Sequence, residues 1–290
     1  MTHKVPTHLI EKHHKAPSQT TTDEAVKLYN DLKTLLGTNY EVFLQGSYKN
    51  DTSVRDMNDV DIVAIRKTTY SGVFSPPATE VRGSIHWNQI FTEIENIIQN
   101  STSYRSRLLP RGDKCIKIGG SVKADIIPAV MHQHQDHDPV IVYSFREGTE
   151  RPNYPRVHYE NGVAKHGRTN KMYKPTVRMF KKWALNHFDD PKIAPSFYVE
   201  CAVHSVPDDK FTGDMVANFI LVAGDVAQKL RDNTPIMSVS GHKNILDEWS
   251  LQNRNIFRNQ LLLSLGLAIK AFHDTTEASA SANWNSTFNI

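Results

Sequence analysis

The sequence lacks the features of several common protein classes. Its 290 residues include two cysteines, Cys115 and Cys201, each in an apolar run, so we predict neither a disulfide framework nor a cysteine zinc site. No apolar run approaches the roughly 18 residues that a membrane-spanning helix needs, and the first residues show no apolar core of a signal peptide. We therefore expect a cytoplasmic protein without a membrane partner.

A strong excess of charge is also absent. Lysine and arginine together number 34, and aspartate and glutamate number 31, which gives a formal net charge of +3. Domains that bind nucleic acid usually carry a larger positive charge, so this balance argues against an obligatory nucleic-acid partner. The hydrophobic content of 39% is ordinary for a globular protein, and the length allows one or two domains with a buried core.

Two carboxylates at the start of an apolar segment are the most informative feature of the sequence. One apolar run, over 42–44, ends at Gly46-Ser47, and a second run opens with Asp59-Val-Asp61. Because side chains alternate along a strand, Asp59 and Asp61 would share one face. A cation between them would relieve their mutual repulsion. The pattern predicts a divalent-metal site beside a Gly-Ser turn that can hold a phosphate.

Helical and strand periodicities are mixed in the N-terminal half. The expected elements are helices over 21–36 and 87–98 and strands over 42–44, 59–65, 114–118 and 122–128. The last two strands would form a hairpin with a Gly119-Gly120 turn. Asp125 in the second arm lies beside Lys123, on the face opposite its apolar neighbours. It is therefore a third strand carboxylate.

The pattern after residue 171 is mostly helical, with apolar stripes over 173–184, 197–203, 215–230 and 255–272. The polar segment 146–168 is expected to be a loop at the change of domain. We predict an α+β protein with a mixed-sheet core and its N-terminal helix over 1–155, and a helical domain over 156–290. The small, polar tail from about residue 278 is expected to be flexible.

The spacing of these features resembles the nucleotidyltransferase superfamily, with its polymerase β-like core. Ser47 is followed by eleven residues and then by Asp-Val-Asp-Ile, and a later strand carries Asp125. The resemblance implies that Asp59, Asp61 and Asp125 are catalytic acids. They would bind two Mg²⁺ ions, or Mn²⁺ in their place, for two-metal phosphoryl transfer.

The same resemblance assigns the segment before the acids to phosphate binding. Gln45, Gly46 and Ser47 would hold the β- and γ-phosphates of the donor nucleotide through backbone N–H groups and the hydroxyl. Lys49 either assists them or is a solvated loop lysine.

Two patterns in the C-terminal half are similar to the group of cGAS, oligoadenylate synthase and DncV, whose bacterial members are called CD-NTases. They are Arg178-Met-Phe-Lys181-Lys-Trp183 and Pro195-Ser196-Phe197-Tyr198-Val199-Glu200. The resemblance implies that Lys181 and Ser196 contact the donor triphosphate and that Phe197, or Tyr198 in its place, stacks on a base. The residues alone also allow Lys181 to be a solvated helix lysine and Ser196 to be a helix N-cap.

One further resemblance concerns which nucleotide base the enzyme would use. Residues 154–162 are similar to a subgroup that includes pyrimidine-using synthases, in part of which a nearby asparagine selects uracil. His166 would occupy that place, which argues against pyrimidine use; the alternative is an ordinary loop histidine. The histidine-rich tract over 132–138 could bind a metal, although a solvated loop is the simpler interpretation.

The resemblance covers about residues 22–272 and implies a bilobal enzyme that holds nucleotides in a cleft between its domains. Such an enzyme condenses NTPs into a cyclic di- or trinucleotide, a second messenger of bacterial anti-phage defence that acts on a separate effector protein. Relatives often end in a tail that a partner protein modifies. Residues 284–288 resemble that tail, although the sequence ends in Ile290 and not in Gly or Ala. The resemblance implies regulatory or tail-modifying partner proteins, and the terminal Ile290 argues against modification of this tail.

Two other functions stay open at this point. One is a nucleotidyltransferase that modifies an RNA end, a small molecule or a protein, and the mild net charge argues against RNA. The other is a catalytically inactive nucleotide-binding protein, and the presence of all three carboxylates argues against it.

Overall fold

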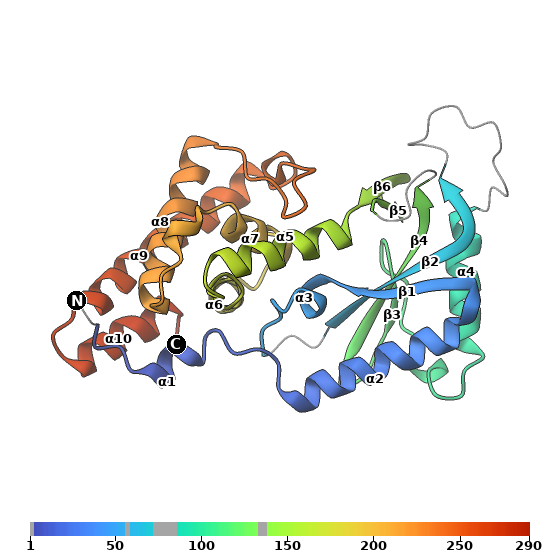
Figure 1. Cartoon of the computed structure of the whole chain (residues 1–290), viewed down its shortest axis with the longest axis horizontal. Helices are drawn as coiled ribbons and strands as arrows, with labels where there is room; N and C mark the ends of the chain where they lie inside the picture. Colours follow the sequence, from blue (N-terminus) through green and yellow to red (C-terminus); the bar gives the residue numbers. More distant parts are fainter. Residues whose placement is uncertain (1–2, 56–58, 72–85, 133–137) are drawn as a thin grey trace. The chain divides into compact units, whose positions relative to one another are not determined.

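The computed structural model describes residues 3–55, 59–71, 86–132 and 138–290, and the chain divides into two compact units (Figure 1). Residues 17–159 form one unit, and residues 1–16 together with 160–290 form the other. This division lies close to the expected boundary after residue 155. The first sixteen residues, however, belong with the helices and not with the sheet.

The unit of residues 17–159 is built on a mixed sheet, which confirms the predicted α+β core. Its strands are β1 (Tyr40–Gln45), β2 (Asp59–Ser71), β3 (Ile116–Ile118), β4 (Lys123–His132), β5 (Val140–Ser144) and β6 (Thr149–Asn153). Among the described residues their order is β1-β2-β4-β5-β6, and β3 also pairs with β4. The β2–β4 pair is parallel, whereas β1–β2, β3–β4, β4–β5 and β5–β6 are antiparallel. β5 and β6 were not predicted from the sequence.

Two helices, α2 (Gln19–Leu36) and α4 (Trp87–Gln99), cover one face of this sheet (Figure 1). Both lie where the apolar periodicity predicts them. Leu32 of α2 and Phe91 of α4 are fully buried in the same cluster as Ile62 of β2 and Ile126 of β4. Since side chains alternate along a strand, the residues next to Ile62 and Ile126 point to the opposite face.

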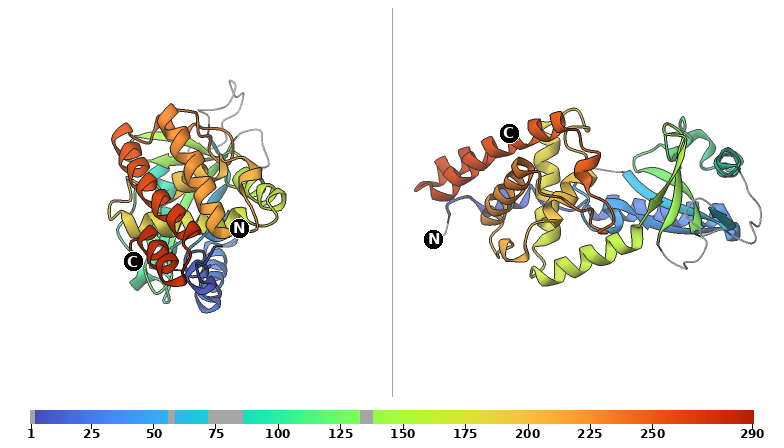
Figure 2. Two further views of the ribbon diagram at one scale, coloured as in Figure 1. Left: turned by 90° about the vertical axis from the view of Figure 1, so that its left-hand side faces the viewer. Right: turned by 90° about the horizontal axis from the view of Figure 1, so that it is seen from above.

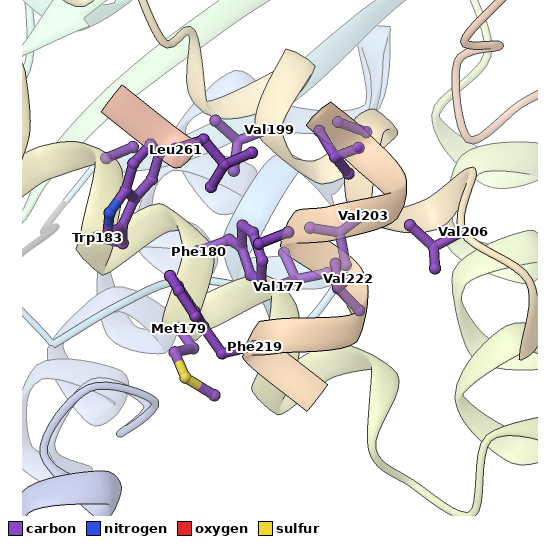
Figure 3. Packing of buried hydrophobic residues seen from close by; sticks show 14 of the residues in the cluster. Val177, Met179, Phe180, Trp183, Val199, Val203, Val206, Phe219, Val222 and Leu261 are labelled. Carbon is purple, nitrogen blue, oxygen red and sulfur yellow. The ribbon is translucent and has the colours of Figure 1, made fainter. Parts of the chain in front are cut away.

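The other unit consists of helices packed around one apolar core. They are α1 (Thr7–Glu11), α6 (Tyr173–His187), α7 (Ser196–His204), α8 (Met215–Asp232), α9 (Leu251–His273), α10 (Glu277–Thr287) and most of α5 (Pro155–Arg168). Phe180 and Trp183 of α6 meet Val199 of α7 and Phe219 of α8 in this core (Figure 3). α9 packs against both α8 and α10 (Figure 2). Within the described ranges, no helix combines the length and the apolar character needed to cross a membrane.

The segment over 146–168 differs from the expected loop. It contains the end of the β5–β6 hairpin and the whole of α5. Pro155 occupies the first helical position, where its fixed φ and missing N–H suit a helix start. The buried residues of α5 are Gly162 and Lys165, so the helix presents no apolar stripe from which it could be recognised.

The C-terminal tail also differs from the expected flexible segment. α10 begins after Thr276, whose hydroxyl accepts the backbone N–H of Ser279 at 3.2 Å. Ala280, Trp284 and Phe288 recur at intervals of four residues and are fully buried. This spacing forms one apolar face, and small residues between the rings allow the helix to pack closely.

The N-terminal segment is tied to α6 and α10. The ring of His13 stacks on that of Phe288, with centroids 3.7 Å apart and an interplanar angle of 12°. Nε of Arg178 donates to the carbonyl oxygen of His14 at 2.7 Å, and Nε1 of Trp284 donates to that of Leu9 at 3.4 Å. These contacts explain why residues 1–16 belong to the helical unit.

The buried imidazole of His13 predicts a specific loss of stability in acid. Burial, followed by the charge of Lys12, lowers its pKa from 6.5 to about 3. Between these values the unfolded chain binds a proton that the folded chain does not, so stability falls as the pH decreases below 6.5. The loss from His13 at pH 5 is about 2 kcal/mol.

The free energy of unfolding, measured in urea at pH 7 and pH 5, checks this expectation. His13→Phe keeps a stacked ring but cannot bind a proton. Between pH 7 and pH 5 the variant should therefore lose about 2 kcal/mol less stability than the unaltered protein. Equal losses in the two proteins would contradict it.

Candidate active site

Three carboxylates lie on the face of the sheet that α2 and α4 leave uncovered. Asp59 and Asp61 are two residues apart on β2, so their side chains point to the same side. The parallel pairing of β2 with β4 places Asp61 opposite Asp125. Asp59 is exposed, whereas Asp61 and Asp125 are half-buried. Strand register thus brings together acids that come from two separate segments of the sequence.

A glycine at the end of β1 closely approaches one of these acids. Gln45, the last residue of β1, is paired with Asp61. Gly46 follows it with a left-handed φ of 67°, and a Cβ at this position would lie 2.0 Å from Oδ2 of Asp61. Both the conformation and the close approach require glycine. The backbone at Gly46 is therefore held in contact with the carboxylate.

The expected Gly-Ser turn is the start of a short helix, α3 (Gly46–Lys49). Ser47 is half-buried, and its carbonyl oxygen accepts two backbone N–H groups from the following loop, at 2.9 and 3.1 Å. Oε1 of Gln45 accepts a side-chain amide of β6 at 2.9 Å. The ammonium of Lys49 lies 4.4 Å from the centre of the Tyr159 ring, which is a cation–π contact. The interpretation of Lys49 as a solvated loop lysine did not include this contact.

Two weak acids beside the carboxylates keep their protons at neutral pH. Burial raises the pKa of the Cys115 thiol to about 12, and the Asp125 carboxylate adds to this through its charge and a hydrogen bond. Burial also raises the pKa of Tyr48, and the charge of Asp59 is the next cause. Both groups are therefore neutral side chains close to the acids. Neither side chain belongs to a recognisable sequence motif, so neither was predicted as part of the site.

Two lysines share the face of the acids. Lys117 on β3 is paired with Asp125, and Lys123 on β4 is paired with Asp59. Both side chains are exposed. Lys123 lies beside Asp125 as predicted, whereas the alignment of Lys117 was not predicted, because it depends on the register of the β3–β4 hairpin, which alternation alone does not specify.

The helical unit contains a buried ion pair at one of the predicted site residues. Nζ of Lys181, on α6, donates to Oε2 of Glu200, on α7, at 2.6 Å, and the two side chains are 2% and 5% exposed. The interpretation of Lys181 as a solvated lysine is therefore wrong. Taking such charges out of water costs on the order of several kcal/mol per ion, and an apolar pair of similar size is often at least as stable. Core stability alone does not explain this pair.

The remaining predicted nucleotide contacts cluster at the start of α7. Ser196 is the first helical residue, and Pro195 stands at the N-cap position, so the interpretation of Ser196 as an N-cap is wrong. The ring of Phe197 is 42% exposed. Tyr198 is half-buried, and its hydroxyl donates to Glu248 at 3.3 Å. Phe197 is thus the better placed of the two rings for stacking on a base.

His166 lies in α5 and not in a loop. It is half-buried, and its ring Nδ1 accepts the backbone N–H of Lys174 at 3.4 Å. The structure therefore groups His166 with the residues of the helical unit, and groups the three acids with Gln45, Gly46, Ser47 and Lys49 in the unit of residues 17–159.

Comparison with known proteins extends these observations. Residues 160–263 match the family described as the cGAS/DncV-like nucleotidyltransferase C-terminal helical domain. The cyclic UMP-AMP synthase of Rhodothermus marinus is 32% identical over 199 residues, which cover 63% of this chain and 68% of that protein. The chain belongs to the CD-NTase family. It is therefore a nucleotidyltransferase, as the sequence resemblance implied.

Other proteins similar to this CD-NTase support the same family assignment. The cyclic dipurine nucleotide synthase of Elizabethkingia meningoseptica is 29% identical over 229 residues, which cover 69% of this chain and 72% of that protein. The solved structure of Rhodothermus marinus CdnE c-UMP-AMP synthase with Apcpp and Upnpp aligns with a TM-score of 0.71 and 25% identity. That alignment covers 90% of this chain and 98% of the other.

The acids of this CD-NTase fit a divalent metal by ligand type and by register. Asp59, Asp61 and Asp125 offer carboxylate oxygens, which Mg²⁺ prefers. Neighbouring strands lie about 4.8 Å apart, so carboxylates on one face are near enough to share ions. In the side-chain positions found across the described ranges, no three Asp, Glu, His or Cys groups converge to hold an ion. The histidine-rich tract falls largely on residues 133–137, outside the described residues.

The contact of Gly46 with Asp61 predicts a selective effect of Gly46→Ala. The added Cβ would displace the Asp61 carboxylate, so the initial rate of pyrophosphate release from NTPs with Mg²⁺ should fall by a factor on the order of 100 or more. Gly37→Ala is the matched control, because Gly37 has a φ of 66° but no atom within 4 Å of its Cβ position. Both variants should lose about 1 kcal/mol of stability from the left-handed backbone.

Gly37→Ala should keep its rate within about twofold of the unaltered protein, because its strain is not transmitted to an acid. If both variants lost activity to the same extent, backbone strain and not the contact with Asp61 would be responsible.

Proposed function

We propose that this CD-NTase joins two or more NTPs and closes them into a cyclic di- or trinucleotide. In each step a hydroxyl oxygen of one nucleotide bonds to the α-phosphorus of another, the bond from that phosphorus to the bridging oxygen breaks, and pyrophosphate leaves. The observation that carries the proposal is the shared face of Asp59, Asp61 and Asp125, with Gly46 in contact with Asp61. Three carboxylates gathered beside a backbone of this shape suit phosphoryl transfer.

The acids have distinct roles in this proposal. Asp59 and Asp61, together with Asp125, would hold two Mg²⁺ ions, which when bound offset the charge of the transferring phosphate and lower the pKa of the attacking hydroxyl. Asp125 would hold the ion next to the attacking hydroxyl, and the protonated Cys115 thiol would orient the Asp125 carboxylate through a hydrogen bond. Asp59, the most exposed of the three, is the most accessible to solvent.

In this proposal, contacts with the donor nucleotide are assigned to the following residues. Gly46 and Ser47, with Gln45 and Lys49 beside them, bind the β- and γ-phosphates, and Lys181 and Ser196 contact the same triphosphate. The exposed ring of Phe197 stacks on the base, with a gain of about 1–3 kcal/mol. The similar Rhodothermus marinus enzyme was solved with two NTP analogues, Apcpp and Upnpp, which supports a site for two NTPs.

The product would act as a second messenger on a separate effector protein, in bacterial defence against phage and in the cytoplasm. The names of the related cyclic nucleotide synthases support a diffusible product. The two free cysteines suit a reducing compartment. Regulatory partner proteins belong to this proposal, since a neighbouring structure, Escherichia coli CdnC, was solved in complex with a HORMA protein.

Asp61→Asn tests the assignment of the acids. The variant loses one metal-binding charge, so the rate of pyrophosphate release should fall by a factor on the order of 1,000. Its melting temperature without metal should stay equal or rise, because one of three neighbouring negative charges is removed. Asp189→Asn, at an exposed acid of the helical unit, is the control and should leave both quantities unchanged.

The same assay separates this function from its alternatives. All four NTPs are incubated with Mg²⁺ and no acceptor, and phosphatase-resistant products are identified by mass spectrometry. A requirement for an added RNA, small molecule or protein would instead indicate an enzyme that modifies that acceptor. Failure to release pyrophosphate with any divalent metal would indicate an inactive nucleotide-binding protein.

His166→Asn tests base selection. Asparagine offers both a donor and an acceptor to the edge of a uracil, whereas the Nδ1 atom of His166 accepts the backbone N–H of Lys174. The variant should incorporate a larger share of UTP than the unaltered protein when all four NTPs compete. His166→Ala is the control, and it should not raise the UTP share. An unchanged product distribution in both variants would remove His166 from the base pocket.

A further inference from the structure

The buried pair of Lys181 and Glu200 lies close to the residues that the proposed function assigns to the triphosphate. Glu200 is four residues after Ser196, so the two side chains share one face of α7, one turn apart. Helical side chains lean toward the N-terminus of their helix, which brings the Glu200 carboxylate back over the turn that begins at Ser196. The Lys181 ammonium, 2.6 Å from that carboxylate, therefore lies beside the first turn of α7.

A second buried polar group adjoins this pair. Tyr173, Val177 and Lys181 follow one another at intervals of four residues on α6. The Tyr173 hydroxyl is buried and has no hydrogen-bond partner in the part of the chain that the structure describes. Burial raises the pKa of this hydroxyl, and the Glu200 charge is the next cause. The Tyr173 hydroxyl and the Lys181–Glu200 pair are thus buried in the same unit as the apolar core of Val177, Val199 and their neighbours.

This arrangement is costly for a core, and a function near the first turn of α7 accounts for it. A buried cation needs an anion at all times, because an unpaired charge in the interior is strongly unfavourable. A phosphate that approaches Ser196 would supply such an anion when a nucleotide is bound. Glu200 supplies it in the structure as it stands.

We propose that Glu200 is the resident counter-ion of Lys181, which neutralises the ammonium while no nucleotide is bound and yields it to the donor triphosphate when one arrives. The inference rests on the proposed function, which provides the triphosphate. The four-carbon stem of lysine is flexible, so the ammonium can turn from carboxylate to phosphate while α6 and α7 stay in place. Glu200 acts through Lys181 and touches no substrate, and it is therefore a positioning residue.

Glu200 should have opposite effects on the stability of the nucleotide-free protein and on its affinity for a nucleotide. Glu200 stabilises the nucleotide-free protein, because it satisfies the buried cation. It also competes with the phosphate for the same ammonium and so weakens nucleotide binding. A residue that merely supported the core would affect the nucleotide-free and nucleotide-bound proteins equally.

Glu200→Gln separates these two effects, because glutamine keeps the size and one acceptor oxygen but removes the charge. The probes are the α,β-methylene analogues of the four NTPs, each with Mg²⁺, and the analogue that most raises the melting temperature of the unaltered protein is used throughout. The nucleotide-free melting temperature of the variant should be lower. The rise produced by the analogue should be larger than in the unaltered protein by several degrees.

Two further variants serve as controls. Lys181→Met/Glu200→Gln removes both charges, so its nucleotide-free melting temperature should recover above that of Glu200→Gln, while its response to the analogue should fall below that of the unaltered protein. Asp208→Asn removes the partner of Lys165, another buried lysine of this unit, whose ammonium lies 2.6 Å from Asp208. This variant should be less stable without nucleotide, yet should respond to the analogue as the unaltered protein does.

The outcomes distinguish the inference from the function on which it rests. If the unaltered protein makes cyclic product and the analogue raises the melting temperature of all four proteins equally, the pair is structural and the inference is overturned. If the unaltered protein neither responds to any analogue nor makes product, the proposed function fails and the inference fails with it. Should Glu200→Gln not fold, Glu200→Asp takes its place: the charge stays but is withdrawn by one methylene, and an enlarged response is again expected.

Discussion

The parallel pairing of β2 with β4 is the constraint on which the sheet unit depends. It sets Asp61 beside Asp125, although the two are far apart in the sequence. A parallel pair requires a long crossover, and the chain between these strands includes α4, which covers the opposite face. A slip of one residue would turn Asp125 into the core and Ile126 out of it. The same apolar packing that stabilises the sheet therefore enforces the register of the acids.

Periodicity predicted the parts of the fold in which one face is clearly apolar. The helices α2, α4, α8 and α9 and the strands β2 and β4 have such faces, and all were predicted, although β2 continues to Ser71, well beyond its expected end at residue 65. The polar α5 has no apolar stripe, so its 3.6-residue period was invisible. The stripe of α10 was present at Ala280, Trp284 and Phe288, but the small polar residues between them resembled a flexible tail.

In the candidate site, too, some features could be predicted from the sequence and others could not. Asp59 and Asp61 were aligned by alternation alone, since both lie on one strand. Lys117 could not be recognised in this way, because its alignment with Asp125 depends on the register of the β3–β4 hairpin. Glu200 could not be recognised either, because it meets Lys181 through the packing of two helices. Lys181 and Glu200 are 19 residues apart and lie on two helices, and no local sequence pattern predicts that both side chains are buried. The spacing of residues within one helix or strand can be read directly from the sequence, whereas burial and contacts between elements depend on the whole fold.

The attachment of residues 1–16 to α6 and α10 has a consequence for synthesis of the protein. This segment leaves the ribosome well before its partners, such as Arg178 and Phe288, are made. Residues 17–159 can fold as a unit in the meantime, since domains generally fold as they emerge. The apolar side chains of Val5 and Ile10 stay exposed until α10 is complete. Residues 1–16 are thus among the last to reach their final places, although they are made before the sheet unit.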